Sequence, residues 1–423
     1  MSQNFHTIAI IGMGYVGLPL ALAFADKGIS VYGLDIDQEK IEKLRKAESY
    51  INYIPDEAIT KAGDNLKPTR GFEVITRCDV VIICVPTPLD HHGIPDLSYV
   101  RDTAMNIGPH LRGKTLVVLE STTYPGTTRN ILRSILLETK PTEADILVAY
   151  SPERVDPGNP MPLQTIPKVV GGETPEATGE AADLYSLIFD TIVPVSSCEV
   201  AEATKLFENI FRNVNIALVN ELKIIFAKMG MDFWEVIDAA ETKPYGFMRF
   251  NPGPGLGGHC IPVDPFYLSW AVREFGTTAK MIELAGRINS AMPDYVIQRV
   301  VEALNSWGRA VNGSRILLLG IAYKPGVNDL RESPSMKIWG KLVLMGALID
   351  FYDPAVPVIP KTRDYPQLAG TQSVVGGVEK RYDVALVLSI DSLTPEVRTL
   401  LNLSDAIIDT KNIVPHSSTV WGA

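Results

Sequence analysis

Short apolar segments recur along the first half of the chain and predict the strands of a parallel β-sheet. The segments are Thr7–Ile11, Ser30–Leu34, Asp79–Val85, Lys114–Leu119 and Asp145–Tyr150. Asp79–Val85 reads DVVIICV and is apolar at nearly every position, as expected for a strand that helices cover on both faces. A smaller strand–helix–strand unit follows over Lys168–Val195. The pattern therefore predicts an α/β domain over residues 1–196.

The longest helical pattern in the chain runs from about Ser197 to Met229. Ser196 and Glu199 have the spacing of a capping box at its start, and Gly230 follows its end. A helix of this length spans about 50 Å, which is more than one small domain needs. We therefore interpret it as a spine that links two halves of the chain and pairs subunits into a homodimer.

Further helices and a second group of strands are predicted in the rest of the chain. The helices are Asp232–Ala240, Phe266–Phe275 and Lys280–Ala303, and Trp307–Gly313 is interpreted as a linker. The strands are Arg315–Leu319, Ala347–Tyr352, Val384–Leu388 and Ala406–Ile408. We expect a helical domain over residues 197–306 and a second α/β domain over residues 307–423.

A glycine-rich turn follows the first predicted strand, with the sequence Gly12-Met13-Gly14-Tyr15-Val16-Gly17. In a GxGxxG motif the first glycine permits the tight turn, the second lets a pyrophosphate approach, and the third lets the helix pack on the strand. The start of that helix stabilises the phosphates. Asp35 ends the second strand, where it can accept hydrogen bonds from the adenosine ribose and repel a 2′-phosphate. The motif predicts a Rossmann-like domain that binds NAD rather than NADP, with Tyr15 and Val16 among the contacts.

The second α/β domain lacks this fingerprint. Gly320-Ile321-Ala322-Tyr323 follows its first strand, so we expect it to bind something other than a dinucleotide. Lys324 and Arg331 precede a helix that begins near Pro334, where they could hold phosphate or carboxylate groups. The predicted fold class is therefore α/β, with two Rossmann-like parallel-sheet domains joined by a long central helix and a helical dimerisation domain.

Charge and composition argue against several kinds of partner. The formal net charge of −10 at pH 7 does not favour nucleic acid or an anionic membrane. The first residues are polar and no uninterrupted apolar span of about 18 residues follows, so neither a signal peptide nor a membrane helix is expected. The four cysteines have no CxxC spacing and the six histidines are scattered. This predicts no metal site and a reducing, cytoplasmic setting.

Polar residues follow two of the predicted strands at the sheet edge where ligands bind. These residues are Pro86 and Thr87 after Asp79–Val85, and Ser121, Thr122 and Thr123 after Lys114–Leu119. Thr122 or Thr123 could face the nicotinamide, although such hydroxyls as often cap the next helix.

Glu153 and Arg154 follow the strand Asp145–Tyr150. Glu153 is a candidate acid, base or water-positioning group, and Arg154 is a candidate contact for an anion. A simple ion pair between these neighbours is the alternative.

The segment Asn251–Asp264, with the sequence NPGPGLGGHCIPVD, presents a single thiol, Cys260. Glycine lets the backbone approach a ligand, and proline fixes a loop at low entropic cost. Such a loop suits a cysteine nucleophile, and the alternative is a connector with an incidental buried cysteine. Lys205 and Asn209 lie four residues apart on the long helix and share one face. Lys205 would otherwise be an ordinary surface charge.

The chain resembles the UDP-glucose/GDP-mannose dehydrogenase family along essentially its whole length. The matching segments, in the family's order, are GMGYVGLPLA, ICVPTPLD, ESTTYPGTT, SPERVDPGN, ATKLFENIFRNVNIALVNE, GPGLGGHCIPVDPFYL and AYKPGVNDLRESPS. The resemblance implies an N-terminal NAD domain, a helical dimerising middle and a C-terminal domain that binds the UDP-sugar substrate. It also implies two successive NAD-dependent oxidations at the sugar C6, from alcohol to carboxylate.

The resemblance also implies a role for individual residues. Cys260 matches the nucleophile that adds to the C6 aldehyde and then forms a thioester. Lys205 matches the lysine that stabilises the oxyanion at C6, and Asn209 and Asp264 match the residues that hold and activate water. Glu153 and Thr122 match residues near the nicotinamide. The other residues that match NAD contacts are Arg331, Pro86, Thr87 and Ser121. The other residues that match substrate contacts are Lys324, Phe250 and Gly257.

One segment departs from the UDP-glucose dehydrogenases, which carry NPEF and a second glutamate four residues after the first. Here Ser151-Pro152-Glu153-Arg154 stands in place of NPEF, and Pro157 stands in place of the second glutamate. A second carboxylate at that position is therefore not available to activate water. SPER and GGHC resemble the N-acetylhexosamine branch, including the members that oxidise UDP-ManNAc. SPERVDPGN with KPYGFM and GLGGHCIPVDPFYL is most similar to the members that oxidise UDP-GlcNAc. We expect UDP-GlcNAc as substrate, with UDP-ManNAc or UDP-glucose as alternatives, and Arg154 beside the N-acetyl group.

Two other classes of protein share part of this pattern. A two-electron dehydrogenase of the β-hydroxyacid type has the first domain and a helical middle, but it needs neither Cys260 nor a third domain. A non-catalytic NAD-binding regulator would not need Lys205, Asn209 and Asp264 to converge.

Overall fold

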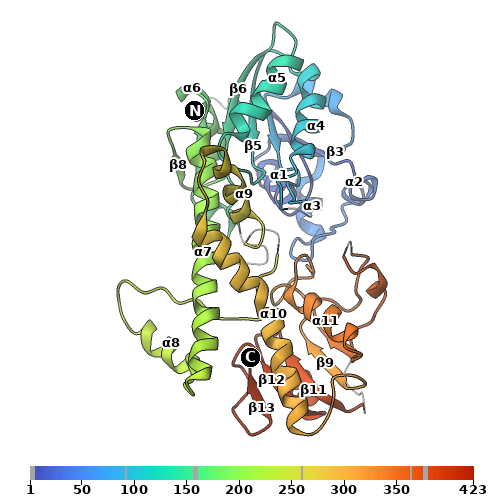
Figure 1. The fold of residues 1–423 in the computed structure, drawn as a ribbon. Coiled ribbons are helices and arrows are strands. Elements are labelled where there is room, and N and C mark those ends of the chain that lie inside the picture. The colour runs from blue at the N-terminus through green and yellow to red at the C-terminus, as the bar shows by residue number, and fades with distance from the viewer. Residues whose placement is uncertain (1–4, 91–92, 156–160, 259–260, 363, 375–379) are drawn as a thin grey trace. The chain divides into compact units, whose positions relative to one another are not determined.

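The computed structural model describes residues 5–90, 93–155, 161–258, 261–362, 364–374 and 380–423 (Figure 1). The chain divides into two compact units. The first is Met1–Glu208 with Phe266–Thr278, and the second is Asn209–Pro265 with Ala279–Ala423. The long helix α7 (Cys198–Lys228) begins in the first unit and ends in the second.

The first unit contains an eight-stranded sheet in the order β3-β2-β1-β4-β5-β6-β7-β8. Its strands are β1 (Thr7–Ile11), β2 (Ser30–Leu34), β3 (Leu66–Thr69), β4 (Val80–Ile83), β5 (Lys114–Leu119), β6 (Asp145–Tyr150), β7 (Lys168–Gly172) and β8 (Ile192–Pro194). Its helices are α1 (Gly17–Asp26), α2 (Gln38–Arg45), α3 (Asp56–Ala62), α4 (Ser98–Ile107), α5 (Ser134–Thr139), α6 (Pro175–Ser186) and most of α9 (Asp264–Ala271). Neighbouring strands are parallel, except that β7 is antiparallel to β6. The predicted α/β class is confirmed, and the order β3-β2-β1-β4-β5-β6 is that of a dinucleotide-binding sheet.

Alternating strand residues form one core on each face of this sheet. In β1, Ile8 and Ile10 belong to a buried cluster with Phe24 of α1. Ala9, between them, belongs to a second cluster with Val100 of α4. Successive side chains of a strand point to opposite faces, so a strand covered on both sides must be apolar throughout. This explains the continuous apolar segments of the sequence.

The second unit contains a five-stranded parallel sheet in the order β10-β9-β11-β12-β13. Its strands are β9 (Arg315–Leu319), β10 (Leu348–Tyr352), β11 (Tyr382–Val387), β12 (Ser404–Asp409) and β13 (Val420–Gly422). Its helices are α8 (Phe233–Glu241), α10 (Lys280–Ser306), α11 (Pro334–Leu344) and α12 (Pro395–Asn402). Leu318 of β9 packs in a cluster with Trp339 of α11, and Leu317 packs in another with Leu400 of α12.

Some predicted boundaries are wrong by a few residues. The strand predicted over Asp79–Val85 is limited to β4, and the helix predicted from Phe266 begins earlier, as α9, and continues in a 3₁₀ turn, Val272–Phe275. The predicted cap at Ser196 is also wrong. Helix α7 begins at Cys198, and the Ser197 hydroxyl accepts the N–H of Val200 at 3.3 Å.

Buried amides fix the second half of α7 to its surroundings in the second unit. The Asn220 side chain donates to Asn289 Oδ1 of α10 at 2.9 Å and accepts the Gly253 N–H at 3.0 Å. Asn289 in turn donates to the Asn213 carbonyl at 3.1 Å. These amides are buried, so each hydrogen bond that they make replaces one to water. The glycine-rich segment that begins at Asn251 is therefore held against α7.

Lys223 lies one turn beyond Asn220 and is 5% exposed. Its Nζ atom has no hydrogen-bond partner among the described residues. Burial lowers the pKa of the Lys223 ammonium to about 7, with Lys411 and Arg299 acting in the same direction and Asp409 opposing them. The folded chain therefore favours the neutral amine over the charged form.

We predict that Lys223→Met stabilises the protein against unfolding at about pH 6 by roughly 3–5 kcal/mol. The folded pKa of about 7 lies below the ordinary 10.5, so the unfolded chain binds a proton that the folded chain loses between these values. The cost to the wild type is full below pH 7 and decreases as the pH rises toward 10.5, and the gain of the variant decreases with it. Urea unfolding across this range measures the change.

Lys228→Met is the matched control, because Lys228 is exposed on the same helix. It should leave stability unchanged at every pH. A gain for Lys223→Met that does not depend on pH would show that the buried ammonium is not the cause.

Candidate active site

The glycine-rich turn between β1 and α1 has the geometry of a phosphate-binding loop. Gly12 has a φ of +96°, and a Cβ there would lie 2.5 Å from the Cys84 carbonyl oxygen. A Cβ on Gly17 would lie 1.9 Å from the carbonyl oxygen of Gly12, which is closer than any side chain permits. A Cβ on Gly14 would meet nothing within 4 Å. The first and third glycines are thus required by the fold, and the second leaves open space where a pyrophosphate would lie.

Asp35 lies at the end of β2, directly beside this turn. Its carboxylate accepts the N–H of Met13 at 2.9 Å and that of Asp37 at 2.9 Å. Lys40 pairs with it at 3.1 Å, a contact that was not predicted from the sequence. The Tyr50 hydroxyl donates to the Met13 carbonyl at 2.5 Å. A carboxylate offers about four acceptor sites, so Asp35 retains acceptor capacity for a ribose hydroxyl.

The segments that follow β4 and β5 are hydrogen-bonded to each other. The Thr87 hydroxyl donates to the Thr122 carbonyl at 2.7 Å, and the Ser121 hydroxyl donates to the Val85 carbonyl at 2.7 Å. Thr123 is fully buried and its hydroxyl donates to Thr127 at 2.6 Å, whereas Thr122 is half-buried. Of the two threonines, Thr122 therefore has its side chain partly open to a ligand. Pro86, predicted beside the cofactor, is exposed.

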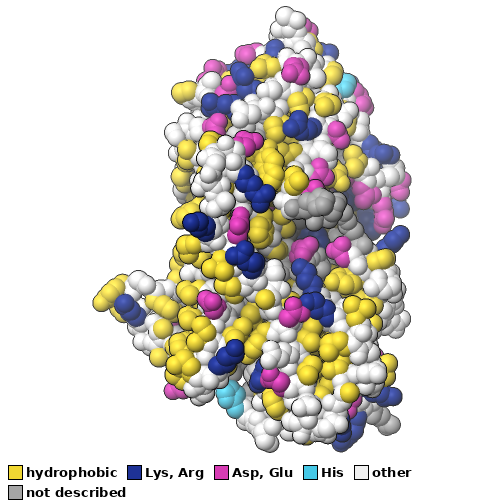
Figure 2. All heavy atoms as spheres, in the orientation of Figure 1, with side chains coloured by type: hydrophobic (Ala, Val, Ile, Leu, Met, Phe, Trp, Pro, Cys, Tyr) yellow, Lys and Arg dark blue, Asp and Glu magenta, His cyan; other side chains and the backbone are white. Residues whose placement is uncertain are grey.

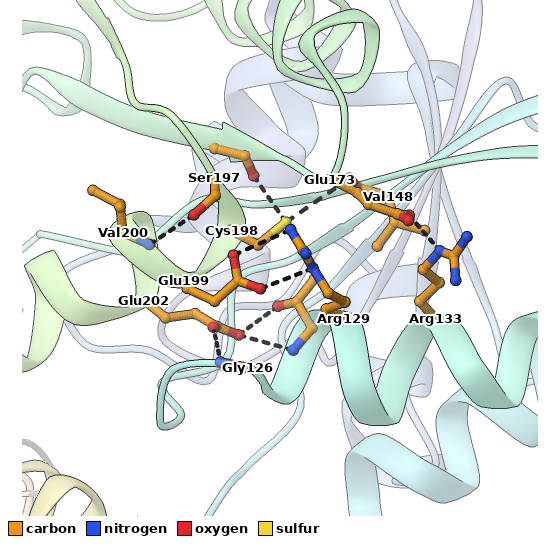
Figure 3. A network of polar contacts seen from close by, with 12 residues as sticks. Gly126, Arg129, Arg133, Val148, Glu173, Ser197, Cys198, Glu199, Val200 and Glu202 are labelled. Carbon is orange, nitrogen blue, oxygen red and sulfur yellow. Dashed lines mark hydrogen bonds and ion pairs between the residues drawn. The ribbon is translucent and has the colours of Figure 1, made fainter.

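A buried carboxylate joins α7 to the chain after β5 (Figure 3). Glu202 accepts the N–H groups of Gly126 and Thr128 at 2.6 and 2.8 Å, and the Thr128 hydroxyl at 2.7 Å. Burial raises the pKa of Glu202 to about 7, and the hydrogen bonds oppose that shift. Arg129 pairs with Glu199 at 2.8 Å in the same network. The first turns of α7 are thereby fixed beside the segment that includes Thr122.

Glu153 and Arg154 do not form the simple ion pair that was the alternative interpretation. Arg154 pairs instead with Glu208 at 2.6 Å and donates to the Pro167 carbonyl at 2.7 Å. The Glu153 Oε1 atom accepts the N–H groups of Arg154 and Val155 at 2.7 and 2.5 Å. The carboxylate thus stabilises its own loop, and Arg154 lies along α7.

Two predicted residues of α7 contact other predicted site residues. Lys205 is 8% exposed and donates to the Glu153 carbonyl at 2.5 Å, within the first unit. Asn209 is 5% exposed and its side chain donates to the fully buried Asp264 at 2.5 Å, within the second unit. Lys205 is thus not the solvated surface charge that its residue type suggests.

The glycine-rich segment before Asp264 packs against the loop after β9. A Cβ on Gly257 would lie 2.7 Å from the Tyr323 side chain, and the Gly258 N–H donates to the Arg331 carbonyl at 3.0 Å. Cys260, the predicted nucleophile, lies outside the described residues. Phe250 is half-buried with its ring 5.7 Å from that of Phe211.

The two cations predicted in the loop after β9 lie among side chains of the second unit. The Arg331 guanidinium pairs with Asp329 at 2.7 Å. The Lys324 ammonium lies 5.7 Å from the centre of the Tyr323 ring. Their predicted contacts, with NAD for Arg331 and with substrate for Lys324, remain predictions.

The described residues contain no group of three or more His, Cys, Asp or Glu side chains arranged to hold a metal ion. Among the described helices, none is both long enough and apolar enough to cross a bilayer.

Models of one protein family match most of the chain. The NAD binding domain of the UDP-glucose/GDP-mannose dehydrogenase family matches residues 6–189, its central domain matches residues 199–291, and its UDP binding domain matches residues 317–416. The chain belongs to this family. It is therefore an NAD-dependent nucleotide-sugar dehydrogenase, with a UDP-sugar as substrate.

Individual members of the family are similar over nearly their whole length. A UDP-N-acetyl-D-glucosamine 6-dehydrogenase of Pseudomonas aeruginosa is 38% identical over 362 residues, which cover 85% of each chain. A UDP-N-acetyl-D-mannosamine dehydrogenase of Escherichia coli is 37% identical, over 79% of this chain and 82% of that one. The structure of a UDP-D-ManNAc dehydrogenase from Pyrococcus horikoshii superposes with a TM-score of 0.85 at 31% identity and covers 98% of both chains.

The described residues of this dehydrogenase fit NAD. The open space at Gly14 and the start of α1 would hold the pyrophosphate, and Asp35 would accept the ribose hydroxyls. NAD, when bound, supplies the hydride acceptor for the oxidation.

We predict that Gly14→Ala folds as the wild type does but binds NAD at least about tenfold more weakly, because the added methyl group would occupy the space of the pyrophosphate. Calorimetric titration with NAD, together with a melting curve, measures both properties. Gly179→Ala is the control, since a Cβ on this exposed residue of α6 also meets nothing within 4 Å. An unchanged affinity in Gly14→Ala would show that the phosphates lie elsewhere.

Proposed function

We propose that this dehydrogenase oxidises C6 of a UDP-N-acetylhexosamine, with UDP-GlcNAc as the preferred substrate, from alcohol to carboxylate. The observation that carries the proposal is the placement of Lys205 and Asn209 on one face of α7, each in contact with a second predicted site residue. The names of the similar enzymes from Pseudomonas and Escherichia support an N-acetylhexosamine. The product would serve the synthesis of surface polysaccharides.

The reaction takes place in two oxidations with Cys260 as the nucleophile. In the first, C6 would lose a hydride, which NAD when bound would accept, and the hydroxyl proton would pass to a base, which would leave an aldehyde. The Cys260 thiolate then adds to the aldehyde carbon to give a thiohemiacetal. Loss of a second hydride, which a second NAD when bound would accept, and of the hydroxyl proton would give a thioester, which water would cleave to the carboxylate and the free thiol. Thiols stay reduced in the cytoplasm, which suits a thiol nucleophile, so we assign the reaction to that compartment.

The buried residues of α7 supply charge and water placement for these steps. The Lys205 ammonium, held at the Glu153 carbonyl, stabilises the oxygen anion that develops at C6. The pair formed by Asn209 and Asp264 holds the hydrolytic water, with the carboxylate as its base. Glu153 and Thr122 orient the reacting end of the substrate beside the nicotinamide, and Arg331 and Lys324 contact NAD and the UDP-sugar.

We predict that wild-type enzyme forms two NADH per UDP-GlcNAc consumed, because the thioester forms only after the second hydride transfer. A spectrophotometric assay with UDP-GlcNAc, UDP-ManNAc, UDP-GalNAc and UDP-glucose counts NADH and ranks these substrates. Cys260→Ser is expected to lose net turnover by roughly a thousandfold or more, since serine is a far weaker nucleophile.

The two alternative classes of protein predict other numbers of NADH per substrate. One NADH per substrate would indicate a two-electron dehydrogenase, and no NADH with any substrate would indicate a regulator. In the same assay, Arg154→Ala should lower the preference for UDP-GlcNAc over UDP-glucose. An unchanged preference would remove Arg154 from sugar recognition.

We propose that α7 also pairs two copies of the chain within the helical segment, residues 197–306. In the second unit α7 exposes large apolar side chains at Phe211, Leu218 and Ile225, and Met229, which follows the last residue of the helix, is exposed as well. The spacing of seven residues places Phe211, Leu218 and Ile225 on one face of the helix. Figure 2 shows exposed hydrophobic side chains in the region where Figure 1 draws α7. A contiguous apolar stripe of this kind fits a self-complementary interface with a second copy.

We predict that Leu218→Glu sediments as a monomer where the wild type sediments as a dimer, because the substitution places a charge in the centre of the stripe. Sedimentation velocity at micromolar concentration measures the change. Leu344→Glu on α11, where the leucine is 88% exposed, is the control and should leave the dimer intact. A wild-type monomer, or a dimer that Leu218→Glu leaves unchanged, would contradict pairing through α7.

A further inference from the structure

Lys168 is the first residue of β7, and the direction of that strand brings it to the candidate active site. β7 is antiparallel to β6, with Tyr150 opposite Gly171. The same register, continued three residues further, brings Lys168 opposite Glu153. In a strand parallel to its neighbours, the first residue would lie at the opposite edge of the sheet. Lys168 therefore lies beside the candidate active site, although a parallel strand would place it at the far edge of the sheet.

The Lys168 ammonium is shared by two carboxylates in a buried environment. Its Nζ atom lies 3.0 Å from Glu120 Oε1 and 3.7 Å from Glu153 Oε2, and it donates to the Pro152 carbonyl at 3.3 Å. The side chains of Lys168, Glu120 and Glu153 are 3%, 0% and 14% exposed. One positive charge thus faces two acidic groups that come from the ends of two neighbouring strands.

Tyr185 of α6 and Phe189, which follows that helix, also contact Lys168. The Tyr185 hydroxyl donates to Glu120 Oε1. The Lys168 ammonium lies 4.9 Å from the centre of the Tyr185 ring and 5.3 Å from that of Phe189, at distances typical of cation–π contacts. Burial lowers the pKa of Lys168, but Glu120 and Glu153 more than offset this, so the net shift is upward. Lys168 is therefore a charged and fixed group.

We infer that Lys168 is a positioning residue, which sets the orientation and charge of the Glu153 carboxylate and, through the Glu153 loop, the place of Lys205. This inference rests on the proposed function. The contacts form one continuous path. Lys168 faces Glu153 Oε2, Oε1 of the same carboxylate accepts the N–H groups of Arg154 and Val155, and the Glu153 carbonyl accepts the Lys205 ammonium.

The simpler alternative is that Lys168 only neutralises Glu120. A buried group of charges is a poor source of stability, because apolar residues of similar volume often stabilise a fold as well or better. The two roles differ in what happens when both charges are removed. A neutralising lysine becomes dispensable once Glu120 is uncharged, whereas a lysine that positions Glu153 does not.

The test compares Lys168→Met, Glu120→Gln and the double variant Lys168→Met/Glu120→Gln with the wild type in the NADH assay. We expect Lys168→Met to lower kcat by about 10–100-fold with an unchanged KM for NAD, since the glycine-rich turn is not altered. Glu120→Gln keeps an acceptor for Tyr185 and Lys168, and kcat should stay within about threefold. The double variant should regain the wild-type melting temperature but not the wild-type kcat.

The pH profile gives a readout that a purely structural role would not move. Glu153 orients the substrate as a carboxylate, and loss of the cation beside it favours its protonated form, so the acid limb of kcat should shift upward in Lys168→Met and by less in the double variant, which also loses the Glu120 charge. The other titratable groups that face this cluster are Glu120 after β5, Tyr185 of α6, Cys84 after β4 and Lys205 of α7. Glu120→Gln removes a like charge near Glu153, so the limb should not shift upward. A double variant with wild-type kcat, or an acid limb that Lys168→Met leaves in place, would overturn the inference.

A second measurement needs no substrate, so it separates this inference from the proposed function. A wild type that oxidises no UDP-sugar would refute the proposed function alone. The melting temperatures of Lys168→Met, Glu153→Gln and the double variant that combines these two substitutions still report whether the two side chains interact. We expect the melting temperature of the double variant Lys168→Met/Glu153→Gln to differ by at least about 2 °C from the value that the sum of the two single changes gives. Additive effects would refute positioning through Glu153. Lys168→Gln replaces Lys168→Met in both tests should the latter not fold.

Discussion

The close approach of Gly17 to the carbonyl oxygen of Gly12 is the constraint on which the nucleotide end of the site depends. A Cβ on Gly17 would lie 1.9 Å from that oxygen, so the first turn of α1 can pack on β1 only if this residue is glycine. The same turn leaves space at Gly14 and places the Met13 N–H against Asp35. Because β1, β2, β4, β5 and β6 are parallel, the ends of these strands lie at the same edge of the sheet. The predicted residues after β4, β5 and β6 therefore lie at the edge where this turn lies.

Buried polar groups, rather than apolar packing alone, determine how α7 presents its site residues. In the first unit Glu202 and Lys205 bind backbone groups of the segments after β5 and β6. In the second unit Asn220 binds the glycine-rich segment, and Asn209 binds Asp264. A buried polar group without a hydrogen-bond partner costs free energy, so each of these contacts favours one rotation of α7 about its axis. Lys223 is the exception, because its buried amine has no comparable partner among the described residues.

The sequence predicts local features of this structure better than long-range ones. The strands β1, β2, β5, β6 and β9 have the predicted bounds, because apolar alternation and length are local properties. β3 reads LKPT and carries no such pattern, so it was not predicted. The cap of α7 was predicted one residue early, since either serine satisfies the spacing rule approximately and only the path of the chain decides between them.

The candidate site shows the same division between local and long-range information. The glycine-rich turn, Asp35 and the pairing of Lys205 and Asn209 with other predicted residues follow from motifs and helical spacing. The partners Lys40, Glu208 and Lys168 were missed. Lys168 depends on the antiparallel entry of β7, and Glu208 depends on the loop after β6 lying along α7. Neither arrangement leaves a signal in a single sequence, because both join residues that are far apart in the chain.

Hydrogen–deuterium exchange with and without NAD tests most directly whether the carboxyl edge of the first sheet is the cofactor site. We expect NAD to slow amide exchange by roughly tenfold or more in residues 13–17 and in the segments after β4 and β5. We expect little change in α10, Lys280–Ser306. Protection confined to the second sheet, with exchange in residues 13–17 unaltered by saturating NAD, would place the cofactor elsewhere.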